Sequence, residues 1–240
     1  MITSRDNERI KNTAKLISSS KLRKEKSLMV LEGERLILEA EVIEELYYTQ
    51  KGYNEALLSR AKVAYEVSNE VFKKLSDTVN PQGVIAVVKR PNHQGGLKQE
   101  GKYLAFENVQ DPGNLGTVAR TAEALGIDGL IVKGVDPYSP KVLRASMGAI
   151  LRIPIFEPEK VLDFVKSSGK RVVGTVVTNA KSIKEFEFKN DIVLIGNEAN
   201  GLTDEAKAIC DELVTIKMAG RAESLNAAAA SSIIAWEMVK

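Results

Sequence analysis

The chain has 240 residues, of which 44% are hydrophobic and 28% charged, and its formal net charge at pH 7 is +2. This length suits one large domain or two modest ones, and the composition is that of an ordered, soluble protein. No apolar stretch reaches the roughly 18 residues of a membrane span, and the polar N-terminus lacks the apolar centre of a signal peptide, so we expect a cytoplasmic protein without a membrane partner. The single cysteine, Cys210, and the single histidine, His93, exclude an internal disulfide and a His/Cys zinc site, and no carboxylate cluster suggests another metal.

Basic residues concentrate at the N-terminus. Within residues 1–26, three carboxylates face eight basic side chains: Arg5, Arg9, Lys11, Lys15, Lys21, Arg23, Lys24 and Lys26. Residues 27–80 are net acidic. Such a segment can bind phosphates, because the release of counterions from nucleic acid favours association. The same pattern is typical of a solvated helix surface, so the charge alone leaves both interpretations open.

The first part of the chain alternates between helical and strand-like periodicity. In chain order, the pattern predicts a helix over 4–20 with Ser4 as N-cap, a strand over 27–33, a helix over 34–45, a short strand over 46–49, helices near 53–61 and 68–76, and a strand over 83–88. The residues that follow combine Pro, Gly and polar side chains, which is the composition of a linker. We therefore predict a first domain over residues 1–90, a linker over 91–100 and a second domain over 101–240.

The alternation of strands and helices resumes beyond the linker. We expect strands over 102–107, 129–132, 153–156, 171–177, 191–195 and 213–216, and helices over 114–125, after Ser139, and over 159–167, 205–209 and 224–239. Apolar runs such as Ile192-Val193-Leu194-Ile195 are typical of parallel strands that are buried on both faces. The pattern predicts an α/β fold whose mostly parallel sheet is covered by helices on both sides.

Three short polar patches lie at the ends of these predicted elements, where binding sites are usually built. They are residues 114–120, 196–201 and 223–226. The second patch directly follows a buried strand, and ligands of open α/β sheets bind beyond the carboxyl ends of strands. In the third patch, Asn226 precedes four alanines, so its amide needs a polar partner if the helix is packed tightly. Together the patches indicate a site in the second domain.

Each patch also has a purely structural interpretation. Asn114 can serve as a helix N-cap, and Arg120 can pair with Glu123 or Glu107 on the surface. The second patch can be an ordinary strand-to-helix turn, and the third can open an Ala-rich core helix with Ser224 as its cap. Residue types alone do not decide between these interpretations and a functional one.

Missing motifs disfavour a conventional Rossmann cofactor site and an NTPase. The sequence contains neither a Gly-x-Gly-x-x-Gly dinucleotide turn nor a Walker phosphate loop, and it lacks a nucleophile elbow. Cys210 follows an apolar residue on a short predicted helix, so we interpret it as a small core residue. His93 lies in the predicted linker, and we expect no catalytic role for it.

Taken in order, the three patches resemble the signature motifs of the SpoU/TrmH family of RNA 2′-O-ribose methyltransferases. The matching residues are Asn114-x-Gly116-x-x-x-Arg120-Thr121-Ala122, Gly196-Asn197-Glu198-x-x-Gly201 and Ser224-Leu225-Asn226. The resemblance covers residues 101–240. The N-terminal part, with Gly33-Glu34-Arg35 after a strand and the strand Gln82–Ala86, resembles the small ribosomal-protein-like domain that binds substrate in such enzymes.

The resemblance implies a SPOUT fold, in which the C-terminal segment forms a deep trefoil knot that binds S-adenosylmethionine largely through backbone groups. It also implies a homodimer whose subunits meet at the knot, a role that suits the small-residue helix start Ala227–Ala230. The residues expected to contact the cofactor are Gly196, Ile216 and Leu225, assisted by Thr175, Ile195, Asn197 and Met218. The family often has Ser at the position of Asn197, and we expect little consequence because the backbone makes the contact.

The implied reaction is an in-line methyl transfer from a sulfonium to a ribose 2′-hydroxyl, which must lose its proton. By resemblance, Arg120 lies closest to this step. A guanidinium is normally too basic to accept a proton, but a nearby sulfonium and desolvation both disfavour its charged form, so base and polarising roles both stay open. Asn114 and Glu198 would orient Arg120 or the ribose, and Ser224 and Asn226 would hold the active-site loops and a substrate phosphate.

The leading hypothesis is therefore an RNA ribose methyltransferase. We favour ribosomal RNA over transfer RNA as its partner, because the first domain resembles a ribosomal protein. One alternative is a transfer RNA 2′-O-methyltransferase. The other, from a different functional class, is a non-catalytic RNA-binding or ribosome-associated module that retains the fold.

Overall fold

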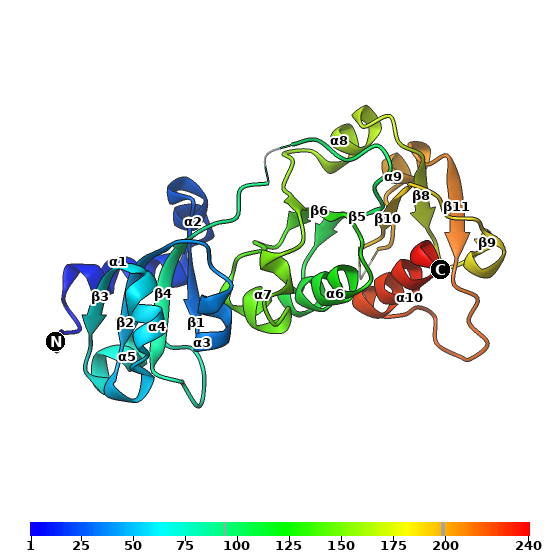
Figure 1. Ribbon diagram of the computed structural model, residues 1–240. Coiled ribbons are helices and arrows are strands. Elements are labelled where there is room, and N and C mark those ends of the chain that lie inside the picture. The colour runs from blue at the N-terminus through cyan, green and yellow to red at the C-terminus, as the bar shows by residue number, and fades with distance from the viewer. Residues whose placement is uncertain (94, 198–199) are drawn as a thin grey trace. The chain divides into compact units, whose positions relative to one another are not determined.

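The computed structural model describes residues 1–93, 95–197 and 200–240, and the chain divides into two compact units (Figure 1). The first comprises Met1–Asn92 together with Tyr138–Leu143, and the second comprises His93–Pro137 and Arg144–Lys240. Among the described residues, no helix combines the length and the apolarity that crossing a bilayer requires.

The first unit is built on a four-stranded sheet with the order β1-β4-β2-β3. The strands are β1 (Leu28–Glu32), β2 (Ile43–Tyr48), β3 (Ala61–Glu66) and β4 (Val84–Lys89). β4 is antiparallel to both of its neighbours, whereas β2 and β3 are parallel. The helices are α1 (Glu8–Ser18), α2 (Ser20–Lys26), α3 (Glu34–Leu38), α4 (Glu55–Arg60) and α5 (Asn69–Leu75), with a 3₁₀ turn η1 (Gln50–Gly52).

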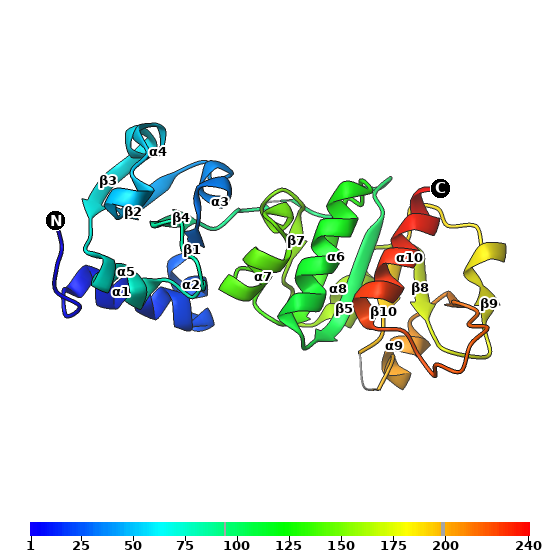
Figure 2. The same cartoon turned by 90° about the horizontal axis from the view of Figure 1, so that it is seen from below.

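Helices cover both faces of this sheet. Figure 2 shows α1, α2 and α5 on one face and α3 and α4 on the other. Ile10 and Leu16 of α1 and Phe72 of α5 pack with strand residues in one apolar core. Because α1 supplies fully or nearly fully buried side chains to this core, the basic N-terminal segment is also a structural part of the unit.

Several predictions for the first unit were wrong in detail, and helix α2 was not predicted. The helix predicted over 34–45 ends at Leu38, and β2 already begins at Ile43. Ile37, Ala40 and Ile43 are all buried, but they lie in a helix, a connecting segment and a strand in succession, so their spacing resembles that of a single helix. Strand β3 was missed; it is a mostly exposed strand at the edge of the sheet. The first helix begins after Asn7 instead of Ser4.

The second unit contains a seven-stranded sheet with the order β7-β6-β5-β10-β8-β11-β9, and every neighbouring pair is parallel. Its strands are β5 (Tyr103–Val109), β6 (Gly129–Gly134), β7 (Ile155–Phe156), β8 (Val172–Thr175), β9 (Lys181–Ser182), β10 (Ile192–Ile195) and β11 (Glu212–Thr215). The helices after residue 93 are α6 (Pro112–Ala124), α7 (Pro140–Ala145), α8 (Val161–Ser167), α9 (Asp204–Ala208) and α10 (Ala227–Val239), with 3₁₀ turns η2 (Ala149–Leu151) and η3 (Ile183–Glu185).

Both faces of the parallel sheet are covered, which confirms the predicted α/β fold. Figure 1 shows α8 and α9 on one side and α6 and α10 on the other. On the first side, Val161 and Val165 of α8 and Ala206 of α9 pack against inward-facing strand residues. The strand order changes direction at β5, since β6 and β7 lie to one side of it and β10 and β8 to the other. Such a switch point, at the carboxyl ends of the strands, is where open α/β sheets bind ligands.

Candidate active site

A cavity of about 640 Å³ lies beside the carboxyl ends of β8, β10 and β11. This volume is within the range of small-molecule sites. All seven residues predicted to contact the cofactor line this cavity: Thr175, Ile195, Gly196, Asn197, Ile216, Met218 and Leu225. Ser224 lines it as well, and α10 contributes Ala227, Ala230 and Ile234. Residues from three segments, 175–183, 195–207 and 213–234, therefore meet around one cavity.

The backbone at the end of β10 is packed too closely to accept a side chain. A Cβ atom built on Gly196 would lie 2.6 Å from the carbonyl carbon of Gly201 and 2.7 Å from the amide nitrogen of Leu202. Two backbone hydrogen bonds join Asn197 and Gly201, from the Asn197 N–H to the Gly201 carbonyl (3.0 Å) and from the Gly201 N–H to the Asn197 carbonyl (2.9 Å). Glycine at position 196 thus lets the main chain of Gly201 and Leu202 pack directly against the end of β10, where both residues line the cavity.

Polar side chains form hydrogen bonds between the ends of neighbouring strands. The Thr175 hydroxyl donates to the carbonyl of Leu194 (3.0 Å), and the Thr215 hydroxyl donates to the carbonyl of Val177 (2.8 Å). Asn197 donates through Nδ2 to the carbonyl of Asn108 (2.8 Å), which lies near the end of β5, beyond its last paired position with β10. These bonds join adjacent strands where the ladder ends, so the rim of the cavity is preorganised by the fold.

Helices α6 and α10 lie side by side and parallel, with their first turns joined by two of the predicted site residues. Asn226 Nδ2 donates to Asn114 Oδ1 (3.1 Å), and further along the helices the Ser232 hydroxyl bonds to that of Thr121 (3.2 Å). Asn226 Oδ1 also accepts from the N–H groups of Ala228 (2.9 Å) and Ala229 (3.3 Å), and so caps α10. The expected polar partner of Asn226 is therefore Asn114.

The caps of the two helices differ from those predicted. The N-cap of α6 is Asp111, whose Oδ1 accepts from the Asn114 N–H (2.9 Å), and Asn114 lies within the first turn. The N-cap of α10 is Asn226 instead of Ser224. Because Asp111 caps α6, the side chain of Asn114 is available to bond to Asn226 at the start of the neighbouring helix. No local sequence pattern predicts this contact.

Arg120 is exposed on α6 and lines a second cavity of about 510 Å³. The other residues around it are Thr117, Thr121, Ala124, Leu125, Ala145, Ser232 and Trp236. Arg120 is not among the described residues around the first cavity, although α10 borders both. Within one chain, the predicted cofactor residues and the predicted catalytic arginine thus line different cavities.

The carboxylates considered as structural partners of Arg120 have other partners. Glu123 pairs with Arg152 (2.8 Å), whose hydrogen bond holds the pKa of this carboxyl below its usual value. Glu107 accepts a hydrogen bond from the Thr203 hydroxyl (3.1 Å). Glu198, the remaining predicted site residue, lies outside the described residues.

Sequence reasoning missed part of the cavity wall. Residues 176–179, Ile183 and Lys207 also line it, together with Glu223 of the third patch. The chain after β8 continues along the rim, and Asn179 has a left-handed backbone (φ 59°), which Asn tolerates better than most residues. Lys207 carries no motif signal, because a single lysine on a short surface helix is common.

Cys210 has the surroundings of a structural residue. Its thiol packs against the core and donates to the carbonyl of Ala206 (3.1 Å), and burial raises its pKa to about 11. A thiol with this pKa is protonated at neutral pH and therefore unreactive. In the described part of the chain, no group of three or more His, Cys, Asp or Glu side chains is arranged to hold a metal ion.

Comparison with known proteins relates this architecture to a family. Residues 101–236 match the SpoU rRNA Methylase family, and residues 7–86 match the MRM3-like substrate binding domain. The chain belongs to the SpoU rRNA methylase family. The match to the SpoU model contains the three patches, the parallel sheet and both cavities described above.

Relatives and solved structures resemble the chain over nearly its whole length. The 23S rRNA (guanosine(2553)-2′-O)-methyltransferase RlmP of Bacillus subtilis is 30% identical over 246 residues, which cover 99% of this chain and 98% of RlmP. The AdoMet-bound rRNA methyltransferase from Sinorhizobium meliloti is 30% identical with a TM-score of 0.87, over 99% of this chain and 96% of that one. The SpoU methyltransferase AviRb from Streptomyces viridochromogenes, in complex with AdoMet, is 29% identical with a TM-score of 0.84, over 97% and 98% of the two chains. The roles of the individual site residues stay predictions.

Proposed function

We propose that this protein transfers a methyl group from S-adenosylmethionine to a ribose 2′-hydroxyl of structured RNA in the cytoplasm, with ribosomal RNA as the substrate class. The observation that carries the proposal is the convergence of the seven predicted cofactor residues around one cavity at the strand ends. The named activity of RlmP and the AdoMet complexes of two similar structures support the same reaction.

The residues around the first cavity suit an adenosyl group that carries a charged sulfonium. Ile195, Ile216 and Leu225 offer apolar surface for the adenine ring, and the backbone around Gly196 offers N–H and carbonyl groups at close range. S-adenosylmethionine, when bound, supplies an electrophilic methyl group. The role of the chain is to hold this group in line with the ribose oxygen and to keep water away from it.

We assign the step at the ribose to Arg120. An Arg120 Nη atom would hydrogen-bond to the 2′-hydroxyl and either polarise it as a charged guanidinium or, in its neutral form, accept its proton as the O–C bond forms and the S–C bond to the methyl group breaks, with the thioether as the leaving group. The Asn226–Asn114 hydrogen bond fixes the first turn of α6, about 1.7 turns before Arg120, and we assign to Asn114 the orientation of the ribose or the guanidinium. Ser224 and Asn226 would hold the loop and a substrate phosphate, with Glu198 as a second orienting group.

A homodimer through a trefoil-knotted C-terminal region completes this proposal. One support is that the predicted cofactor residues and Arg120 line different cavities of one chain. The other is that α10 exposes apolar residues: Ile233 is 39% and Trp236 58% exposed. Ala227 and Ala228 are buried in the chain itself, so the subunit contact would use the exposed face of α10. Trp236→Glu should convert a dimer to monomers in sedimentation experiments and reduce transfer, and an unchanged sedimentation coefficient would contradict this contact.

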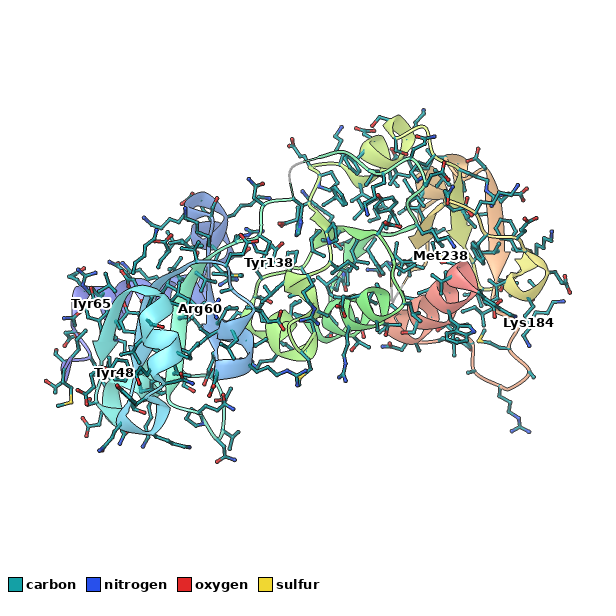
Figure 3. The ribbon with its side chains drawn as sticks, viewed as in Figure 1. Tyr48, Arg60, Tyr65, Tyr138, Lys184 and Met238 are labelled. Atoms are coloured by element: carbon teal, nitrogen blue, oxygen red, sulfur yellow. The ribbon has the colours of Figure 1, made fainter. Side chains whose placement is uncertain are left out.

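We further propose that residues 1–90 bind the RNA substrate and that residues 91–100 act as a linker. Part of the basic N-terminal segment serves the fold: buried Arg23 donates to the carbonyl of Ile17 (2.8 Å), and Arg9 pairs with Glu45 (3.3 Å) and lies over the ring of Tyr65. Figure 3 labels Tyr65. Lys15, Lys24 and Lys26 are exposed on α1 and α2 and are the side chains we expect to contact phosphates.

This basic surface is tested by substitution, since deletion of residues 1–26 would remove α1 and its core side chains. Changing Lys15, Lys24 and Lys26 to Gln should weaken RNA binding and lower the slope of log Kd against log salt by up to about 0.9 per lost phosphate contact. Lys62→Gln is the matched control, because Lys62 pairs with Glu44 elsewhere on the unit (2.8 Å). An identical slope in the triple variant would refute the role of these lysines.

The activity itself is tested in two stages. S-adenosylmethionine is titrated into the purified protein by calorimetry, and 2′-O-methyl sites are then mapped in unmethylated ribosomal and transfer RNA incubated with and without the protein. We expect binding followed by methylation of ribosomal RNA at a defined ribose. Methylation of transfer RNA alone would favour the transfer RNA alternative, and binding without transfer would favour the non-catalytic module.

A further inference from the structure

Charged side chains are scarce around the first cavity. Of the described residues that line it, only Lys207 and Glu223 are ionisable, and they carry opposite signs. The others are apolar residues, glycines and neutral polar residues such as Thr175 and Asn179. Lys207 comes from α9, and Glu223 comes from the segment that precedes α10. A cavity with one group of each sign suits a ligand that itself carries both signs.

The backbone of Lys207 is fixed to the sheet. The hydroxyl of Thr203, the N-cap of α9, accepts from the Ala206 N–H (3.1 Å) and donates to Glu107 of β5 (3.1 Å). Ala206 is fully buried in the core, and the Lys207 N–H bonds to the Thr203 carbonyl (3.0 Å). The lysine side chain therefore starts from a rigid point beside the cavity.

The present partner of the Lys207 ammonium group is a weak one. Nζ pairs with Oδ1 of Asp204, three residues earlier on α9, at 3.0 Å. The Asp204 side chain is fully exposed and that of Lys207 is 42% exposed, so solvent screens the pair, and such pairs contribute little. An ammonium group has three donors, so a carboxylate of a bound ligand can join Asp204 or replace it.

We propose that Lys207 binds the carboxylate of the methionyl group of S-adenosylmethionine, and so selects ligands that have this group. The inference rests on the proposed function. Taking a carboxylate out of water requires a compensating charge or hydrogen bonds. Among the described residues around the cavity, Lys207 is the one cation that can supply them. Glu223 has the sign that suits the α-ammonium group of the same ligand.

The test compares two adenosine thioethers that differ in the amino-acid tail. S-adenosylhomocysteine has the α-carboxylate and the α-ammonium group, 5′-methylthioadenosine lacks both, and neither carries the sulfonium charge. Their Kd values are measured by calorimetry for wild type, Lys207→Gln and Lys207→Arg. Thermal melts establish that each variant is folded, so a change in Kd can be attributed to the site.

Two further variants serve as controls. Lys160→Gln is the matched one, because Lys160 pairs with Asp163 at the same i,i+3 spacing (3.7 Å) and lines neither cavity. Asp204→Asn removes the present partner of Lys207 but keeps the lysine. It therefore separates the contribution of the pair on α9 from that of the ammonium group.

We expect Lys207→Gln to raise the Kd for S-adenosylhomocysteine about three- to tenfold, the loss of a charged hydrogen bond reduced by solvent screening. The Kd for 5′-methylthioadenosine should not change. Lys207→Arg should stay within about twofold of wild type for both ligands, because a guanidinium also binds carboxylates. Lys160→Gln should match wild type, and Asp204→Asn should bind S-adenosylhomocysteine at least as tightly.

The opposite results are equally definite. An unchanged Kd for S-adenosylhomocysteine in Lys207→Gln would overturn the proposal, and so would an equal loss for both ligands, which would indicate a damaged cavity. A loss in Asp204→Asn as large as that in Lys207→Gln would assign the effect to the pair on α9. Wild-type protein that binds S-adenosylhomocysteine but methylates no RNA would refute the proposed activity, while the Kd comparison would still decide the role of Lys207.

Discussion

The two cavities of the second unit are made from different parts of the polypeptide. The first lies at the ends of parallel strands, and its wall is shaped by main chain that folds back over Gly196. The second lies on α6 and α10, and its polar groups belong to individual side chains such as Arg120 and Ser232. A site made by backbone should be sensitive to added volume, whereas a site made by exposed side chains should lose its chemistry without losing its fold. The predictions below test this difference.

Arg120→Ala should have the largest effect on activity. We expect turnover to fall about 100- to 10,000-fold, the usual contribution of a group that moves or polarises a proton. Because Arg120 is exposed and does not border the first cavity, the melting temperature and the calorimetric Kd for S-adenosylmethionine should match wild type. Arg120→Lys keeps a positive charge but loses the planar fork, and it serves as the control. Unchanged turnover in Arg120→Ala would remove this residue from the mechanism.

Gly196→Val should damage both folding and cofactor binding. Its Cβ would collide with the backbone at Gly201, and the forced shift should cost about 1–3 kcal/mol of stability. Affinity for S-adenosylmethionine should fall with it, as measured by calorimetry after thermal melts establish that the variant is folded. Gly220→Ala is the control, since a Cβ there meets open space. If Gly196→Val binds the cofactor like wild type, the wall of the first cavity is not backbone-limited.

Asn226 joins the two regions, and its two roles can be separated. Asn226→Ala removes the cap of α10 and should cost about 1 kcal/mol in denaturant unfolding. Asn226→Asp keeps a capping oxygen but removes the amide that donates to Asn114, so it should preserve stability and reduce transfer. Equal transfer by Asn226→Asp and wild type would show that the link to Asn114 serves packing alone.

The smallest effect concerns the ion pair between Glu123 and Arg152. The Arg152 hydrogen bond lowers the folded-state pKa of Glu123 below its unfolded value, so the pair stabilises the fold above that unfolded value, about 4.3. Its contribution is lost as pH falls through the folded-state pKa. Arg152→Gln should therefore lose up to about 1 kcal/mol at pH 7, and the difference from wild type should shrink towards zero below pH of about 4. A difference that is constant from pH 7 to 3.5 would indicate lost packing instead of lost charge pairing.

Prediction from the sequence was reliable where local pattern and burial agree. The apolar run Ile192–Ile195 predicted a buried parallel strand, and β10 lies in the middle of the sheet. It was wrong for residues 34–45, where buried residues continue from a helix into the next strand, and for β3, which is an exposed strand at the edge of its sheet. Periodicity records which residues are buried, but it does not distinguish a helix that ends early from one that continues.

The candidate site divides in the same way. Gly196 and Ser224 were predicted as site residues from short motifs, because their residue types are unusual beside apolar runs, and both line the first cavity. The hydrogen bond between Asn114 and Asn226 was not foreseen. It depends on two helices whose contacting residues are 112 positions apart in sequence.

The amino-acid sequence by itself determined the alternation of strands and helices, and hence a parallel sheet with helices on both faces, because side-chain periodicity and apolar runs are local properties. The tertiary structure alone decided that β10 lies between β5 and β8, that Arg23 is buried against helix carbonyls, and that Arg120 faces a different cavity from Gly196. The physical reason is that strand order and helix packing are set by long-range contacts between surfaces of similar hydrophobicity, which local periodicity does not distinguish.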